Sequence, residues 1–274
     1  MTRSAHTWRT VDERHMKQTE SKVIVRVDGD GRRSQKDAVI IEHALTITLN
    51  DKQFVTMLCT PSDLEALGLG FLLSEGIIRS MEDVESLSLS DDHGELKIYL
   101  KADVTLAEEL FGKRAITSGC GRGSIFYNVL DALDLRVVSS DAKVSASSII
   151  RIANEVQAMS ALFKSTGGAH AAALCDKDKV LIFKEDIGRH NAVDKVFGEC
   201  LVRGLETCGN ILFTSGRISS EILLKAVKRE IVIVASRSAP TSLAVQFADK
   251  AGVTLVGFVR GRRMNIYSND YRIE

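Results

Sequence analysis

The first hundred residues carry a hydrophobic pattern that predicts a small α+β unit. Four stretches alternate apolar and polar positions, or run apolar, and are rich in β-branched side chains, which favours strands. A fifth stretch has apolar positions every three or four residues, which is typical of a helix, and Gly76 is placed to end it. The expected elements are strands at 23–27, 38–50, 53–60 and 87–101, the last with a turn at 91–94, and a helix at 64–76.

The C-terminal half changes to a rhythm of strands and helices. Two helices are expected first, at 125–135 and 145–166, and Gly167 and Gly168 follow the second. Apolar runs then alternate with amphipathic segments, which predicts a mainly parallel sheet with helices on both faces. The strands are expected at 170–176, 179–186, 211–215, 231–236, 254–259 and 264–268, and the helices at 189–204, 219–230 and 239–252.

These patterns divide the chain into three parts. Residues 1–21 are polar, carry charges of both signs and show no period, so we expect them to form a mobile arm. Residues 22–112 are expected to form the small α+β domain. Residues 113–274 are expected to form a larger α/β domain that begins with a glycine-rich loop. The predicted fold class is therefore α/β, with a smaller α+β domain at the N-terminus.

Composition narrows the class of protein. The 274 residues contain 36 Lys and Arg against 36 Asp and Glu, so a net charge of zero gives no general reason to expect nucleic acid or membrane as a partner. No uncharged apolar run approaches the roughly 18–20 residues of a membrane span, and the first residues lack the apolar stretch of a signal peptide. Five cysteines, none within four residues of another, fit thiols in a reducing cytoplasm better than disulfides or a zinc ribbon.

The glycine-rich loop at 112–124 holds the strongest chemical signal. A thiol becomes reactive when nearby cations or a helix N-terminus lower its pKa, and Cys120 has Arg122 and the predicted helix cap Ser124 close in sequence. The alternative is a buried, inert thiol, but the loop has few side chains that could bury one. Cys59, Cys175 and Cys200 fit that alternative because each lies in an apolar strand or helix, and Cys208 is assigned to the same class. Lys113, Arg114, Gly119, Gly121 and Gly123 complete the surroundings of Cys120.

A second signal is the set of cations that follow three predicted strands. Arg217, Arg237 and the segment 260–263 come directly after strands of parallel type, whose carboxyl ends should meet at one edge of the sheet. Guanidinium groups bind phosphate with two hydrogen bonds, and glycine lets a ligand approach the backbone. The sequence therefore predicts a site for a ligand that carries phosphate, with solvated basic turns as the alternative.

The segment from Glu185 to Asn191 mixes carboxylate, guanidinium and imidazole groups at a strand-to-helix turn. Asp186 and His190 could orient a ligand or handle protons, but the same residues could equally cap the helix. His170 opens an expected strand and lacks the zinc deaminase pattern, because Ala172 stands where that pattern has Glu and no P-C-x-x-C follows. A zinc-activated water is therefore not expected, and a nucleotide-acting hydrolase would require bound zinc.

Several of these blocks together resemble the formate dehydrogenase accessory sulfurtransferase family. The blocks TSGCGRGS, GGAHAAALCD, EDIGRHNAVDKVFG, LFTSGRISSEILLKA and FVRGRRMNIYS occur in the family's order, within a similarity that spans about residues 23–267. The resemblance implies that Cys120 accepts a persulfide sulfur from a cysteine desulfurase and passes it to the molybdenum cofactor before the cofactor enters formate dehydrogenase. It also implies a cytidine deaminase-like fold without zinc ligands for the larger domain. The residues that would bind the bis(molybdopterin guanine dinucleotide) form of the cofactor are Phe258, Val259, Arg260, Gly261, Arg262 and Arg263.

The sequence departs from the family pattern at one position in the loop. Many relatives carry C-x-x-C there, whereas Gly123 stands at the second position, so Cys120 is expected to work alone. The alternative function is a chaperone that binds the cofactor and apo-formate dehydrogenase without moving sulfur. A homodimer is expected in either case, because two copies could enclose so large a ligand.

Overall fold

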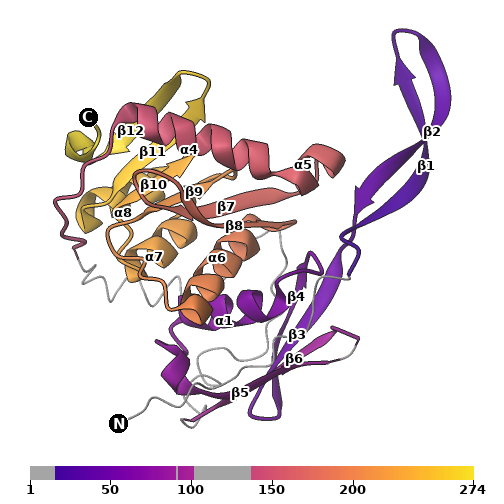
Figure 1. The fold of residues 1–274 in the computed structure, drawn as a ribbon, viewed down its shortest axis with the longest axis horizontal. Helices are drawn as coiled ribbons and strands as arrows, with labels where there is room; N and C mark the ends of the chain where they lie inside the picture. The colour runs from indigo at the N-terminus through magenta and orange to yellow at the C-terminus, as the bar shows by residue number, and fades with distance from the viewer. Residues whose placement is uncertain (1–15, 91, 102–136) are drawn as a thin grey trace.

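The computed structural model describes residues 16–90, 92–101 and 137–274. The Cys120 loop, the helix expected at 125–135 and most of the expected N-terminal arm therefore lie outside the described residues. The division into domains at residues 22 and 113 stays a prediction. In the described part, the strands form a hairpin, a four-stranded sheet and a six-stranded sheet (Figure 1).

The four-stranded sheet and its helix follow the expected pattern closely. The strand order is β4–β3–β6–β5, with β3 parallel to β6 and the two outer pairs antiparallel. Apolar side chains such as Leu45, Ile47 and Leu96 alternate into the core between this sheet and the helix α1. Gly76 ends α1 with a φ of 81°, a left-handed conformation that favours glycine. The bounds are β3 His43–Leu49, β4 Lys52–Cys59, β5 Val84–Leu89, β6 Glu95–Leu100 and α1 Leu64–Glu75.

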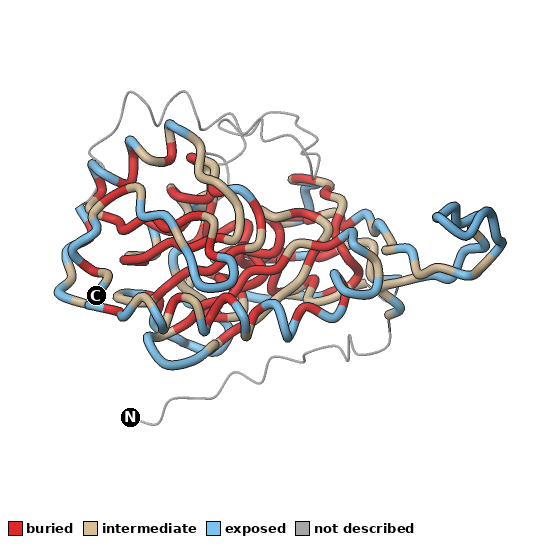
Figure 2. The backbone as a smooth tube through the Cα atoms, turned by 90° about the horizontal axis from the view of Figure 1, so that it is seen from above, coloured by how far each residue is buried: buried red, intermediate tan, exposed pale blue. Residues whose placement is uncertain are grey.

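The N-terminal strands differ from the prediction. The run expected as one strand at 38–50 breaks at Ile41 and Glu42, and its first part belongs to a separate hairpin. This hairpin pairs β1, Thr19–Asp28, with β2, Gly31–Ile40, over ten antiparallel residue pairs. Strand β1 begins inside the segment expected to be a mobile arm. The hairpin projects from the body of the molecule, and most of its residues are exposed (Figure 2).

The six-stranded sheet has the order β12–β11–β10–β9–β7–β8. The prediction of a mainly parallel sheet is wrong. Only the pairs β9–β10 and β10–β11 are parallel, whereas the other three pairs are antiparallel. The two parallel connections use helices as crossovers, but β7–β8 and β11–β12 are hairpins, which reverse direction. The bounds are β7 His170–Cys175, β8 Val180–Asp186, β9 Ile211–Thr214, β10 Ile233–Ser236, β11 Thr254–Arg260 and β12 Arg263–Ser268.

Helices cover both faces of this sheet, as expected. The helices that connect β8, β9, β10 and β11 lie on one face of the sheet, and α4 lies across the opposite face (Figure 1). The helix expected at 145–166 is divided at Ser160, whose ψ of 71° leaves the helical region. The bounds are α4 Ala146–Met159, α5 Ala161–Thr166, α6 Arg189–Arg203, α7 Ser220–Lys228 and α8 Ser242–Ala251.

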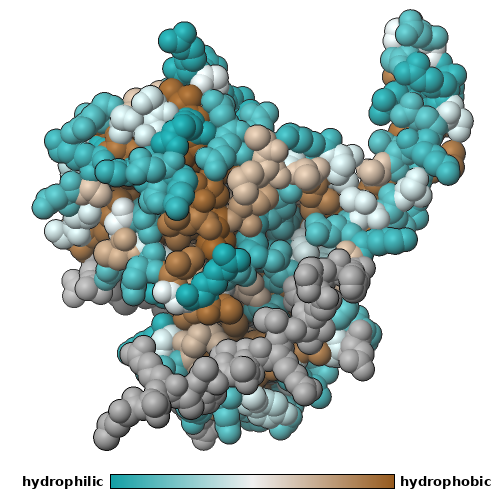
Figure 3. Space-filling view, viewed as in Figure 1, coloured by the Kyte–Doolittle hydropathy of each residue, from teal (hydrophilic) through white to brown (hydrophobic). Residues whose placement is uncertain are grey.

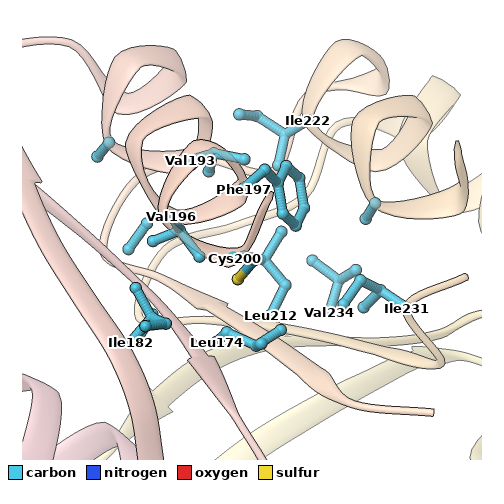
Figure 4. Packing of buried hydrophobic residues seen from close by; sticks show 14 of the residues in the cluster. Leu174, Ile182, Val193, Val196, Phe197, Cys200, Leu212, Ile222, Ile231 and Val234 are labelled. Atoms are coloured by element: carbon cyan, nitrogen blue, oxygen red, sulfur yellow. The ribbon is translucent and has the colours of Figure 1, made fainter. Parts of the chain in front are cut away.

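The core of the larger sheet is apolar and includes two of the cysteines. Figure 4 shows Val193, Val196, Phe197 and Cys200 of α6 facing Leu212 and other strand residues. Burial raises the pKa of the Cys200 thiol to about 11 and also raises that of Cys175, so both thiols stay protonated, as expected for inert ones. None of the helices in the described residues is both long and apolar enough to span a membrane.

The helices α1 and α6 join the two sheets by a contact between their backbones. A Cβ atom added to Gly70 would lie 1.8 Å from the carbonyl oxygen of Asp194, and one added to Gly198 would lie 1.8 Å from that of Ala66. Glycine at both positions therefore lets the helix axes approach more closely than side chains would allow.

Two buried ion pairs lie beside this crossing. The Nζ of Lys195 on α6 lies 2.7 Å from an Asp186 carboxylate oxygen, and it also donates to the hydroxyl of Thr60. The Nζ of Lys225 on α7 lies 2.5 Å from Asp194, whose carboxylate also accepts a hydrogen bond from the Ser74 hydroxyl at the end of α1. Burial raises the pKa of Asp194, and Lys225 opposes that effect. The ion pairs link α6 to β8 and to α7, and the hydrogen bonds of Thr60 and Ser74 connect them to the segments that flank the small sheet.

We predict that Gly70→Ala and Gly198→Ala each lower the free energy of unfolding by about 1–3 kcal/mol or more, because each added methyl group would collide with a carbonyl of the facing helix. Denaturant unfolding of the full chain measures this change in the free energy of unfolding. Gly29→Ala is the matched control, since nothing lies within 4 Å of a Cβ at that position. Equal stability of the Gly70→Ala variant and the control would show that the crossing can relax.

Candidate functional site

The three strand ends that carry cations lie next to one another. The loop after β9 pairs with the loop after β10 through Ile218 and Pro240, and the amide of Phe258 donates to the Ser238 carbonyl oxygen at 3.1 Å. The structure thus brings together the segments that carry Arg217, Arg237 and Arg260, as the sequence suggested. We name this surface, at the carboxyl ends of β9, β10 and β11, the arginine edge.

Backbone and side-chain contacts orient two of these arginines. The Nε of Arg260 donates to the carbonyl oxygen of Arg237 at 2.9 Å. The Arg237 guanidinium donates to the side-chain oxygen of Gln157 near the end of α4. Arg217 and Arg260 are exposed and Arg237 is half-buried, so cationic groups are presented to solvent along the edge. Such an arrangement can bind phosphate groups of a bound molecule.

The segment from Phe258 to Arg263 forms the end of the β11–β12 hairpin. Phe258 has a φ of 53°, in the left-handed region, at an irregularity where the two strands shift register. Its ring lies 5.9 Å from the guanidinium of Arg260. Gly261, Arg262 and Arg263 are exposed, whereas Val259 is 1% exposed, so the Val259 side chain belongs to the core and is not available to a ligand.

Two further groups that the sequence analysis did not assign to the site lie at the same edge. The Nδ1 of His170 lies 3.4 Å from the hydroxyl of Ser215, which accepts a hydrogen bond from the Ala171 amide. A Cβ at Gly216 would lie 3.0 Å from that of Arg189, so this glycine makes room for the Arg189 side chain. Burial, together with the charge of Arg189, lowers the pKa of His170, which is therefore neutral at pH 7. A glycine directly after a buried strand was the sequence signal for this close approach.

The contacts of Asp186 favour the capping role over proton handling. Its carboxylate is fully buried and accepts hydrogen bonds from the amide and hydroxyl of Thr60, the amide of Gly188 and the side chain of Asn191. It also forms the ion pair with Lys195. Because both of its carboxylate oxygens accept hydrogen bonds, Asp186 positions the start of α6 and the segment after β4.

His190 is a second residue whose surroundings argue against a charged form. Its Nε2 lies 3.4 Å from a carboxylate oxygen of Glu221, but the two atoms do not form a hydrogen bond. Burial lowers the pKa of His190 to about 3, and the positive charges of Lys225 and Arg189 add to the effect. His190 is therefore neutral at physiological pH and does not pair with Glu221 as a cation.

The remaining predicted residues, Cys120 and Arg122, lie outside the described residues. Within residues 16–90, 92–101 and 137–274, no group of three or more His, Cys, Asp or Glu side chains is placed to hold a metal ion. A groove of about 490 Å³ lies away from the arginine edge, beside the loops that precede β9 and β10. The exposed Cys208 lines this groove, together with Arg79, Thr207 and Lys228.

Comparison with known proteins gives a consistent result. Residues 40–274 match the FdhD/NarQ family. The chain is 41% identical to the sulfur carrier protein FdhD of Bacillus subtilis over 238 residues, which cover 87% of this chain and 91% of that protein. It is 42% identical to the sulfur carrier protein FdhD of Bacillus pumilus over 237 residues, 86% of this chain and 90% of the relative.

A solved structure resembles the chain over most of its length. The crystal structure of a putative formate dehydrogenase accessory protein from Desulfotalea psychrophila aligns with a TM-score of 0.75 at 27% identity. The alignment covers 94% of this chain and all of that chain. The likeness supports a mixed α/β fold, and the finer resemblance to the cytidine deaminase fold stays a prediction.

We predict that Asp186→Asn costs roughly 3–5 kcal/mol of stability, because it leaves the fully buried Lys195 ammonium without a counter-charge. Urea unfolding of the single variants and of the Asp186→Asn/Lys195→Met double variant measures the coupling. The double variant should lose less than the sum of the two single losses. Wild-type stability in Asp186→Asn would contradict the structural role of the pair.

We predict that His190 contributes to a loss of stability in mild acid. Its pKa is about 3 in the folded state and about 6.5 when unfolded, so below pH 6.5 only the unfolded state takes up the proton. Stability is complete above about pH 6.5 and falls toward pH 3, by about 2 kcal/mol at pH 5 from this residue. The slope of unfolding free energy against pH should be shallower in His190→Gln. Identical slopes, or an NMR titration of His190 near pH 6.5, would contradict this assignment.

Proposed function

Because the chain belongs to the FdhD/NarQ family, we propose that it is a sulfur carrier that serves formate dehydrogenase in the cytoplasm. The observation that carries this proposal is the match to relatives named sulfur carrier protein FdhD over nearly nine-tenths of the chain. The matched family segment includes Cys120, the residue whose sequence surroundings best fit a reactive thiol. The arginine edge adds support, since a carrier needs a place to hold the molecule that receives the sulfur.

The first step is the acceptance of sulfur from a cysteine desulfurase. The Cys120 thiolate attacks the outer sulfur of the donor's cysteine persulfide. A new S–S bond forms at Cys120, the S–S bond of the donor breaks, and the donor cysteine leaves as a thiolate. Since Gly123 stands where many relatives have a second cysteine, the loop has no second thiol that could displace the sulfur by forming a disulfide with Cys120. The persulfide on Cys120 therefore remains until an acceptor takes it.

The acceptor in this proposal is the molybdenum cofactor in its bis(molybdopterin guanine dinucleotide) form. The cofactor is cargo rather than a resident group, and its phosphates suit the exposed guanidinium groups of Arg217, Arg260, Arg262 and Arg263 and the half-buried one of Arg237. Gly261 lets a ligand approach the backbone, and the half-buried Phe258 ring offers an apolar surface. His170 and Arg189 extend the same edge. A homodimer, in which two edges enclose the cargo, completes the proposal.

Mass spectrometry tests the carrier role directly. After incubation with a cysteine desulfurase and cysteine, the wild-type chain should gain one sulfur on Cys120, and Cys120→Ala should gain none. Cys208→Ala is the matched control, because Cys208 is also exposed but lies in the groove away from the arginine edge. It should gain sulfur as the wild type does. Added sulfur that survives in Cys120→Ala would identify another cysteine as the carrier.

Activation of formate dehydrogenase separates transfer from chaperoning. A carrier requires Cys120, so Cys120→Ser should abolish activation of the enzyme while binding of GDP, as a probe for the guanine dinucleotide, is retained. A chaperone that only binds the cofactor would keep full activation in Cys120→Ser and lose it when Arg260, Arg262 and Arg263 are replaced by Ala. That second pattern would overturn the sulfur transfer.

A further inference from the structure

The β1–β2 hairpin has one apolar face that is open to solvent. Val23, Val25 and Val27 alternate along β1 and are 73%, 51% and 68% exposed. Because side chains alternate between the two faces of a strand, these three valines lie on the same side of the ribbon. A two-stranded hairpin that projects into water gains little from such residues and is marginally stable by itself. The valine row therefore points to a surface that another molecule covers.

Cations border this face on the neighbouring strand. In the antiparallel register, Val27 faces Arg32, Val25 faces Ser34 and Val23 faces Lys36. Directly opposite residues share a face, so Arg32 and Lys36 flank the valine row. The opposite face differs, because it holds two ion pairs. There, Lys22 contacts Glu20 at 2.9 Å and Arg33 contacts Asp28 at 2.8 Å. Figure 3 shows hydrophobic surface at the margins of this largely hydrophilic arm.

The base of the hairpin adjoins the arginine edge. The side chain of Ile40, the last residue of β2, lies 3.0 Å from the position of a Cβ on Gly168. Gly168 is two residues before His170, and the carbonyl oxygen of Ala171 accepts a hydrogen bond from the Ser215 amide. A protein that takes a ligand from the arginine edge would therefore meet the hairpin. The family match begins at residue 40, so nearly all of the hairpin precedes the shared family segment.

From these observations, we infer that the valine face of the hairpin docks cofactor-free formate dehydrogenase, through an apolar surface bordered by carboxylates. The inference rests on the proposed function, which makes that enzyme the protein that approaches the edge. Charge argues against a second copy of this chain as the occupant. Two hairpins could stack these faces with β1 over β1 or with β1 over β2. In the first arrangement Arg32 and Lys36 would face the same cations of the other copy, and in the second they would face its valines.

Binding of the full-length chain to purified, cofactor-free formate dehydrogenase tests this surface. We expect Arg32→Glu/Lys36→Glu to raise the Kd by on the order of tenfold or more, because repulsion replaces attraction at the rim. Val25→Asp should act in the same direction. The matched control is Lys22→Glu/Arg26→Glu, which makes the same change of net charge on the opposite face and should leave the Kd almost unchanged. Thermal unfolding should show equal stability of all four proteins.

Three results would overturn the inference. One is an equal effect of the two double variants, which would indicate general charge attraction. Another is an unchanged Kd in both Arg32→Glu/Lys36→Glu and Val25→Asp. The third is a wild-type dimer that Val25→Asp converts to a monomer in sedimentation equilibrium without weakening enzyme binding, since the face would then join two copies. Sulfur loading of Cys120, measured in the same preparations, is independent of these outcomes. Its failure in the wild type would count against the proposed function instead.

Discussion

The contact between the backbones of α1 and α6 is the constraint on which the rest of the structure depends. Gly70 and Gly198 each lie against a carbonyl of the facing helix, so the distance between these helices is set by main-chain atoms. One helix packs on the four-stranded sheet and the other on the six-stranded sheet. Fixing this distance therefore fixes how the two sheets sit against each other, and it places Thr60, which follows β4, beside Asp186, the last residue of β8.

The helix contact also determines the arrangement of residues at the arginine edge. The position of α6 determines where Arg189 emerges beside Gly216 and His170. The loops after β9 and β10 and the end of β11 are held to one another by main-chain hydrogen bonds, and the Arg260 side chain adds one to the carbonyl oxygen of Arg237. The backbone beneath the cations is therefore held in place, and hydrogen bonds also orient the side chains of Arg237 and Arg260. A backbone held in place beneath oriented guanidinium groups suits the ligand binding that the proposed carrier role requires.

Sequence patterns predicted those features whose causes are local. The helix α1 and its end at Gly76 follow from apolar spacing and a glycine cap, and the cations after β9, β10 and β11 follow from strand ends. The break at Ile41 and Glu42 was missed because neither residue signals a turn. The break at Ser160 was missed because serine is also common within helices. The capping role of Asp186 could not be chosen in advance, since its partner Thr60 lies 126 residues away. The antiparallel share of the larger sheet was missed because the direction of a strand is a property of the whole topology.

The buried pair of Asp186 and Lys195 also has a consequence for how the molecule opens. Both side chains are fully buried, and the pair lies where the segment after β4 meets α6. Separating the two sheets would remove Thr60, whose amide and hydroxyl donate to Asp186 and whose hydroxyl accepts from Lys195, and would leave both buried charges with lost hydrogen bonds. Partial opening at this junction is therefore costly from its first step, and the two sheets should exchange their core amide hydrogens together, as one cooperative unit.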